Sequence, residues 1–232
     1  MATFFAKVVG IQNGHKGSLF CTPKKINEVR YEDLSGVDYI KVESGCADVR
    51  IISANKDTLG ANLTGDVSSN GEITLEVSKN GNTITVEVKH TGTTIKGKLN
   101  LYLGISNTMF KKLKVEGSNS TIFVEKGIKA KSVVLDSANG NITFLGDSPN
   151  IKAEVSNGNI DLYIDAKSDV TFTAESTNGN IDVRLRNISE CKVDASTVFG
   201  SIQRFYTCDG AYKVSGSAET SNGDITLRNQ SL

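Results

Sequence analysis

Two aspartates in successive copies of a repeated segment are the residues best placed to do chemistry together. Asp161 and Asp182 each directly follow the isoleucine of an Asn-Gly-Asn-Ile motif, so they hold the same position in neighbouring copies. If the copies stack as strands, the two backbones lie about 5 Å apart on one face. Two carboxylates that close could hold a cation or act as an acid–base pair on a polysaccharide, as in polysaccharide-cleaving β-helices.

A simpler interpretation of the same residues is a solvated protein surface. Tyr163 and Arg184 follow the two aspartates on the same outward face, and Arg184 can relieve the repulsion between the carboxylates. Surface carboxylates are mostly solvated and carry no chemistry. The aligned positions in other copies are uncharged, namely Thr143, Gln203 and Thr226. We therefore interpret Asp161, Tyr163, Asp182 and Arg184 as a candidate ligand surface, not as a catalytic site.

Other catalytic chemistry lacks the residues that it needs. The two histidines, His15 and His90, lie outside the repeats, whereas a nucleophilic site needs a histidine beside a serine or cysteine. The Gly-containing segments precede strands, whereas a phosphate-binding loop opens a helix and carries Lys-Ser/Thr. We predict no catalytic residue, no cofactor and no metal ion.

Cysteines, charge and hydropathy limit the compartments and partners. Cys21, Cys46, Cys191 and Cys208 lack metal-ligand spacing, and we expect free, mostly buried thiols, which favours a reducing compartment. The net charge is zero, without the basic block or aromatic cluster of a nucleic-acid-binding protein. No apolar run is long enough to span a bilayer. Lys7 interrupts the apolar start, so no secretory signal is recognisable, and whether a leader was removed stays open.

The strongest pattern is an internal repeat with a period near 20 residues. Its copies are marked by isoleucines 18 to 23 residues apart, namely Ile122, Ile142, Ile160, Ile181, Ile202 and Ile225. Four copies carry Asn-Gly before the isoleucine, at Asn139-Gly140, Asn157-Gly158, Asn178-Gly179 and Asn222-Gly223. Because Asn-Gly tolerates the positive φ of a tight corner, we interpret these pairs as structural corners, not as ligands.

Apolar residues alternate on both sides of each corner, as in 151–155 and 160–164. This period of two predicts strands with one buried face. Two topologies fit the pattern: an antiparallel meander with Asn-Gly hairpins, or a solenoid in which like positions stack. Recurrence of the same residue types at the same corner favours the solenoid, because stacked asparagines can hydrogen-bond along the column.

We therefore predict an all-β protein, a β-solenoid (single-stranded β-helix or β-roll) with coils of about 20 residues over 111–232. Residues 36–110 are expected to be an irregular β region with a hairpin around Asn80-Gly81, either the first coils or a sandwich-like cap. Residues 1–35 are expected to be an N-terminal extension or cap, because an open solenoid end is a bare strand edge. Within them, 23–34 is predicted as a short helix.

Several segments together resemble a bacterial family called "putative adhesin". They are Ser44-Gly45-Cys46-Ala47-Asp48-Val49-Arg50-Ile51, the strand 98–103 and the Ser-Asn-Gly-Asn-Ile coils, within residues 36–228. Members of this family are β-strand-repeat domains of unknown function, some of them in envelope-stress proteins of Gram-positive bacteria. The resemblance implies a β-solenoid fold and a cell-envelope or adhesive role.

Three hypotheses for function follow from these observations. The first is a non-enzymatic binding or scaffold module, whose flat faces would suit an unknown protein, a cell-envelope glycan or a second copy of itself. The second is a carbohydrate-active β-helix enzyme that uses Asp161 and Asp182. The third is an intracellular partner in envelope-stress regulation, favoured by free thiols and the absence of a recognisable export signal.

Overall fold

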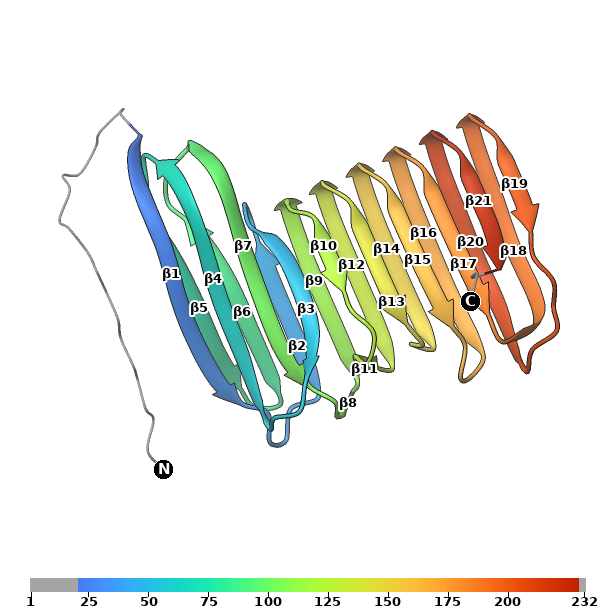
Figure 1. The fold of residues 1–232 in the computed structure, drawn as a ribbon, viewed down its shortest axis with the longest axis horizontal. Helices are drawn as coiled ribbons and strands as arrows, with labels where there is room; N and C mark the ends of the chain where they lie inside the picture. Colours follow the sequence, from blue (N-terminus) through green and yellow to red (C-terminus); the bar gives the residue numbers. More distant parts are fainter. Residues whose placement is uncertain (1–20, 230–232) are drawn as a thin grey trace.

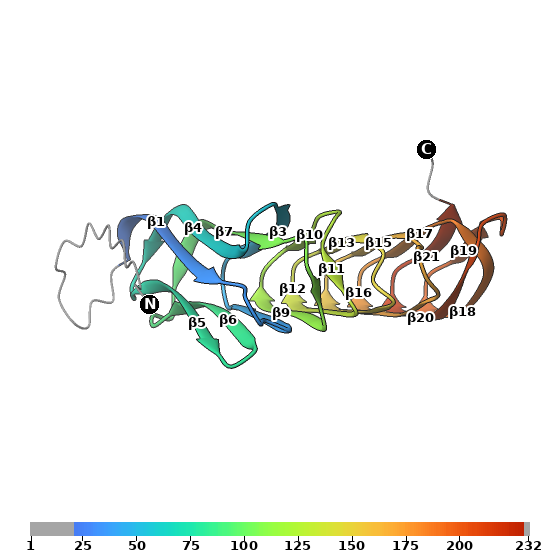
Figure 2. The ribbon, with the colours of Figure 1, turned by 90° about the horizontal axis from the view of Figure 1, so that it is seen from below.

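Two long β-sheets face each other along the whole molecule, a computed structural model that describes residues 21–229 (Figures 1 and 2). Sheet A contains, in spatial order, β1 (Thr22–Asp33), β4 (Thr58–Ser69), β7 (Ile95–Ser106), β3 (Asp48–Ala54), β10 (Ile122–Val124), β13 (Ile142–Gly146), β15 (Ile160–Asp165), β17 (Ile181–Arg186), β21 (Ile225–Asn229) and β19 (Ile202–Phe205). Sheet B contains β18 (Ile188–Phe199), β20 (Tyr212–Asn222), β16 (Val170–Asn178), β14 (Asn150–Asn157), β12 (Ser132–Asn139), β9 (Lys112–Asn119), β2 (Tyr39–Ser44), β6 (Thr83–His90) and β5 (Ile73–Asn80). Two short strands, β8 (Met109–Phe110) and β11 (Lys129–Ala130), form a third sheet.

Each repeat is one coil of a solenoid. The chain runs along a strand of sheet B, turns at the corner, returns along a strand of sheet A and enters the next coil (Figure 1). Neighbouring coils pair in parallel with like residues opposite each other, for example Ile160 opposite Ile181. A meander would pair these strands antiparallel, so the structure confirms the predicted solenoid. The expected hairpin is also present, because β5 and β6 pair antiparallel.

The core between the sheets consists of stacked aliphatic columns. Five of the six marker isoleucines stand opposite one another on β10, β13, β15, β17 and β21, and each of them is at most 1% exposed. The sixth, Ile202 on the outermost strand β19, is 37% exposed. Sheet B supplies smaller side chains such as Ala153, Ala174 and Ala218, also fully buried. Because every coil repeats the same apolar positions, each added coil buries its inner face against the previous one.

The corner asparagines form a hydrogen-bonded ladder along the solenoid. The side-chain amide of Asn139 donates to Asn119 Oδ1 at 3.0 Å, and Asn157 donates to Asn139 at 3.0 Å. Asn178 donates to Asn157 at 2.9 Å, and Asn222 donates to Asn178 at 2.7 Å. Each side-chain amide therefore donates a hydrogen bond to the asparagine of the adjacent coil, at a corner that faces solvent.

The residues on both sides of the ladder complete the corner. The hydroxyl of Ser176 donates to the backbone carbonyl of Gly158, and the Oδ1 atom of Asn159 accepts the backbone N–H of Asn180 at 2.8 Å. A Cβ atom at Gly179 would lie 1.9 Å from the carbonyl oxygen of Gly158. Glycine is therefore required here by the close approach of consecutive coils.

At both ends the coils stack out of sequence order. The coil β20–β21 is inserted between β16–β17 and β18–β19, so residues 188–205 form the outermost coil (Figure 1). At the other end, the coil β6–β7 lies outside the coil β2–β3, and β4 and β5 pair antiparallel with β7 and β6.

The predicted helix at 23–34 is wrong, because these residues form β1, which pairs antiparallel with β4 over twelve residues. Its side chains alternate, with Ile26 and Glu28 facing inward and Tyr31 facing out at 71% exposure. The segment begins near Pro23 and contains β-branched and aromatic residues, which favour strands. Pairing with the distant strand β4 therefore stabilises it more than a short helix would. The part of the N-terminal extension before residue 21 lies outside the described residues.

The close approach at Gly179 predicts a stability cost for any side chain there. We expect Gly179→Ala to lower the free energy of unfolding in urea by about 2 kcal/mol or more, because the methyl group forces two coils apart. Gly45→Ala is the matched control, since a Cβ atom at Gly45 would meet nothing within 4 Å. Equal losses for the two variants would contradict the coil-contact explanation.

Candidate functional site

The four residues of the candidate ligand surface lie together on the outer face of sheet A. Asp161 on β15 stands opposite Asp182 on β17, and Tyr163 stands opposite Arg184. Inward-facing residues Ile160 to Ile164 alternate with them and are buried, which fixes the outward direction of the other side chains. The structure thus places the four side chains on one patch, about one strand spacing apart.

The two aspartates of this patch have opposite electrostatic environments. Burial raises the pKa of Asp182, but hydrogen bonds from Arg228 and Arg184 outweigh burial and hold the pKa below its ordinary value. Arg184 Nη2 lies 2.8 Å from Asp182 Oδ2, and Arg228 Nε lies 3.1 Å from Oδ1. Burial and the neighbouring charge of Asp182 raise the pKa of Asp161. Two arginines therefore neutralise Asp182, whereas Asp161 has no ion-pair partner among residues 21–229.

Arg228 belongs to this patch and was missed by sequence reasoning. It stands opposite Arg184 on β21, because β21 packs directly against β17. Arg184 also stacks on the ring of Tyr163, with its guanidinium carbon 4.2 Å from the ring centroid. The signal was present in the sequence, since Arg228 follows Ile225 at the same offset as Arg184 follows Ile181.

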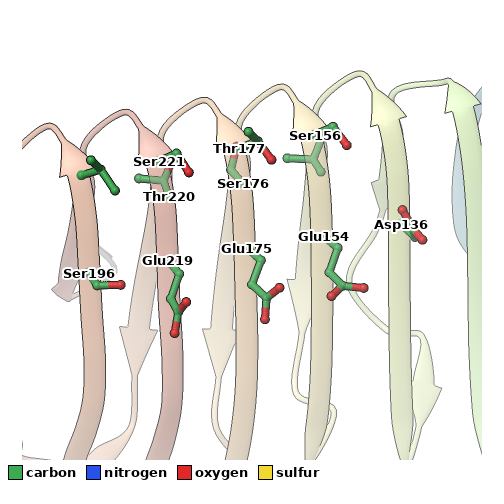
Figure 3. Close-up of a pocket in the computed structure, with 12 residues that line it drawn as sticks. Asp136, Glu154, Ser156, Glu175, Ser176, Thr177, Ser196, Glu219, Thr220 and Ser221 are labelled. Atoms are coloured by element: carbon green, nitrogen blue, oxygen red, sulfur yellow. The ribbon is translucent and has the colours of Figure 1, made fainter.

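The outer face of sheet B carries a second feature, a continuous line of carboxylates that we name the acidic column. Its members stand opposite one another on seven neighbouring strands and are Glu87, Glu43, Glu116, Asp136, Glu154, Glu175 and Glu219. Figure 3 shows its last four members pointing outward from parallel strands. Neighbouring members are separated by one strand spacing, about 4.8 Å.

Lysines neutralise only part of the acidic column. Lys114 lies 2.7 Å from Glu116, and Lys152 lies 2.8 Å from Glu154. Among residues 21–229, Asp136, Glu175 and Glu219 have no ion-pair partner. Burial, followed by the charges of Glu154 and Glu116, raises the pKa of Asp136; burial and the charge of Glu154 likewise raise the pKa of Glu175.

The last four members of the acidic column, from Asp136 to Glu219, border a shallow hollow of about 360 Å³. Hydroxyl side chains such as Ser156 and Ser221 rim this hollow (Figure 3). A negative, hydroxyl-rimmed surface can bind cationic groups or the hydroxyls of an extended ligand. Sequence reasoning missed this column because it considered charged residues only on the strands after the corner. The signal is an acidic residue three positions before the ladder asparagine, as in Glu175 before Asn178.

A serine–histidine pair is present, but its geometry does not make a nucleophile. Ser69 Oγ lies 2.8 Å from His90 Nε2, and the same hydroxyl donates to the carbonyl of Gly71. The nitrogen must therefore donate to the serine, which is the wrong arrangement for a general base. Ser69 is also only 1% exposed. Burial and the nearby charge of Lys24 lower the pKa of His90, which favours a neutral ring in a structural hydrogen bond.

The four cysteines are free, but the expectation that they are mostly buried is wrong. Cys21, Cys46 and Cys191 are half-buried and Cys208 is exposed. Cys46 lies at a corner and Cys191 on the outermost coil, where fewer neighbouring strands cover a side chain. Burial raises the pKa of the Cys46 and Cys191 thiols, so neither is an activated nucleophile.

Neither a metal-binding cluster nor a membrane-spanning helix occurs in the part of the chain that the structure describes. Residues 21–229 contain no group of three or more histidine, cysteine, aspartate or glutamate side chains arranged to hold a metal ion. The same residues contain no helix with the length and apolar character needed to cross a membrane.

Comparison with known proteins identifies relatives of the solenoid. Residues 103–231 match the protein family described as Toastrack DUF4097. A "putative cell adhesion protein" from Clostridium sporogenes is similar in structure, with a TM-score of 0.58 and 14% identity over 89% of this chain and 100% of that chain. A "putative adhesin" from Bacteroides fragilis has a TM-score of 0.44 and 12% identity over 88% of this chain and 98% of that chain. None of the curated proteins matches this chain in sequence. At these identities the structural likeness shows the fold alone.

The acidic column predicts opposite effects for two of its members. We expect Asp136→Asn to raise the free energy of unfolding at pH 7 by about 0.5 kcal/mol, because it removes a carboxylate repelled by its neighbours on both sides. We expect Glu116→Gln to lower it by a similar amount, because Lys114 and Lys41 hold the pKa of Glu116 below its ordinary value.

The pH dependence checks the signs of these two effects. The pKa of Asp136 is raised, so its unfavourable contribution is present at pH 7 and disappears as pH falls through the folded pKa towards 3.8. The pKa of Glu116 is lowered, so its favourable contribution is present above about 4.5 and is lost as pH falls through its folded pKa. Urea titrations from pH 3 to pH 7 measure both differences. A destabilising effect of Asp136→Asn at pH 7 would contradict uncompensated repulsion in the column.

Proposed function

This chain belongs to the Toastrack DUF4097 family, and we propose that it is a non-enzymatic binding module that holds an extended partner against its flat outer faces. The observation that carries this proposal is the in-register parallel stacking of the coils, which sets one outward residue per strand at a regular spacing on each sheet. A surface that repeats at each strand suits a ligand with its own regular repeat, and many weak contacts then add along its length.

The partner that we propose for the sheet A patch is a cell-envelope glycan. Asp161 lacks an ion-pair partner among residues 21–229 and is free to accept hydrogen bonds from sugar hydroxyls. Beside it, the stacked pair of Tyr163 and Arg184 offers an aromatic edge and guanidinium donors. The adhesive description of the Clostridium sporogenes protein adds to this proposal of an envelope role, but belongs to that protein.

A second candidate function is glycan cleavage by the two aspartates. The observation that favours it is the opposite direction of their pKa values, raised for Asp161 and lowered for Asp182, as an acid and an ionised partner require. Against it, Asp182 is already bound by two arginines, which hold it away from the role of nucleophile or base. We therefore favour binding without cleavage.

Glycan binding can be measured by co-sedimentation of the purified chain with insoluble cell-wall glycan. We expect the wild-type chain to sediment with the glycan and the double variant Asp161→Asn/Tyr163→Ala to bind about tenfold more weakly, because an acceptor and an aromatic contact are lost. Thr143→Val is the matched control, since Thr143 stands opposite Asp161 on β13 and carries no charge. A wild-type chain that stays in the supernatant would exclude the glycan as partner.

The same incubation tests the enzymatic candidate. We expect no soluble saccharide to be released, because the lowered pKa and paired state of Asp182 leave Asp161 without a catalytic partner. Reducing-end assay of the supernatant measures release. Release by the wild-type chain that disappears in Asp161→Asn would establish cleavage in place of binding.

A further inference from the structure

The two ends of the solenoid are finished differently. At the N-terminal end, β1 lies across the gap between the sheets and contacts β5 (Figure 2). Glu28 accepts the backbone N–H of Leu75, and Lys79 donates to the carbonyls of Asp33 and Ser35. At the other end, within residues 21–229, no strand pairs with the outer edge of β18 or of β19. The outermost coil therefore presents two open strand edges.

The open end is also the most apolar exposed part of the described surface. Val198 is 70% exposed, Phe199 is 74% exposed and Phe205 is 66% exposed, all on β18 and β19. Inward-facing residues of β18, such as Cys191 and Val193, pack on the core but are only half-buried. Residues of interior strands in the same two columns, namely Val214, Val170 and Phe172, are at most 2% exposed, so one more layer would complete the core.

We propose that a second copy of this chain covers the open end, with the two β18 strands paired antiparallel about a two-fold axis through Val193. This inference is independent of the proposed ligand. A two-fold axis perpendicular to the sheets reverses strand direction but keeps each inner face inward. The inner face and the open backbone edge of β18 in both copies are then covered together. A head-to-tail stack would instead meet β1, which already covers the core at the opposite end.

The charges on the outer face of β18 are self-complementary in one register. Lys192 and Asp194 both point outward. Lys192 lies 2.6 Å from Glu190 of its own strand, and Asp194 makes no ion pair among the described residues. With the axis through Val193, Lys192 of each copy stands opposite Asp194 of the other, which gives two unlike pairs. On the inner face, Cys191 of each copy stands opposite Ala195 of the other, which gives two apolar pairs.

Two neighbouring registers place like charges together. An axis through Lys192 sets Lys192 against its own copy, and an axis through Asp194 sets Asp194 against its own copy. A shift by a single residue between the strands would place inward side chains opposite outward ones. An axis through Cys191 also sets Glu190 opposite Lys192, but it places Asp194 opposite Ile188, beyond the register shift between Ile188 and Glu190. Charge, parity and the regular part of β18 together favour the register centred on Val193.

Sedimentation of the full chain with a charge swap and its rescue tests the proposal. We expect the wild type to have twice the mass of the 24.8-kDa chain. Asp194→Lys sets two lysine pairs against each other and should weaken the dimer at least about tenfold. The double variant Lys192→Asp/Asp194→Lys exchanges the charges and should restore it. Thr173→Lys, on the same outer row but on the interior strand β16, is the matched control and should leave the mass unchanged.

A disulfide provides a second, geometric measurement. In a Cys191→Ala/Cys208→Ala background, Val193→Cys should cross-link two copies under mild oxidation, because the Cα atoms of directly opposed residues in antiparallel strands lie within disulfide range. Lys152→Cys, on β14 in the interior of sheet B, should not cross-link in the same background. A monomeric wild type at about 100 µM, far above the dissociation constant of a stable dimer, would overturn the proposal. A dimer that neither responds to Asp194→Lys nor cross-links through position 193 would overturn it equally.

Discussion

The in-register parallel pairing of one coil with the next is the constraint on which the rest of this structure depends. Parallel strands hold like residues one strand spacing apart. The burial, hydrogen bonding or charge of one position therefore recurs in the next coil along the solenoid. At inward positions this gives the buried isoleucine columns, and at the corner it gives the ladder from Asn119 to Asn222. At outward positions the same rule forces like charges together, as in the acidic column.

The ladder also explains why the last coils stack out of sequence order. The coil at 188–205 carries Phe199 where the others carry the ladder asparagine, so it can accept or donate no amide hydrogen bond there. If it lay directly beside Asn178, Asn222 would be separated from the ladder. Insertion of the coil at 212–229 instead lets Asn222 donate to Asn178, and the coil without the asparagine becomes outermost. A single residue at the corner is thus consistent with a change in the topology of the end.

The sequence alone predicts those features of the structure that depend on the local repeat. The solenoid, its corners and the proximity of Asp161 and Asp182 follow from local patterns repeated every 20 residues. The strand β1 does not, because its alternation is largely polar and its partner, β4, lies some 36 residues further along the chain. The acidic column could have been predicted, since its members share one offset from the corner, but its partial neutralisation depends on lysine conformations that no repeat specifies.

Regular stacking also separates the roles of the two outer faces. On sheet A, Arg184 and Arg228 both form ion pairs with Asp182, and their two positive charges balance the two aspartates. The patch is therefore close to neutral, and Asp161 has no ion-pair partner among residues 21–229. On sheet B, the lysines accompany the acidic column only as far as Glu154, and the charge accumulates beyond it. The negative end of sheet B therefore lies nearest the open coil. A second molecule that approaches the open coil meets this negative charge, whose position is set by the pairing of the strands.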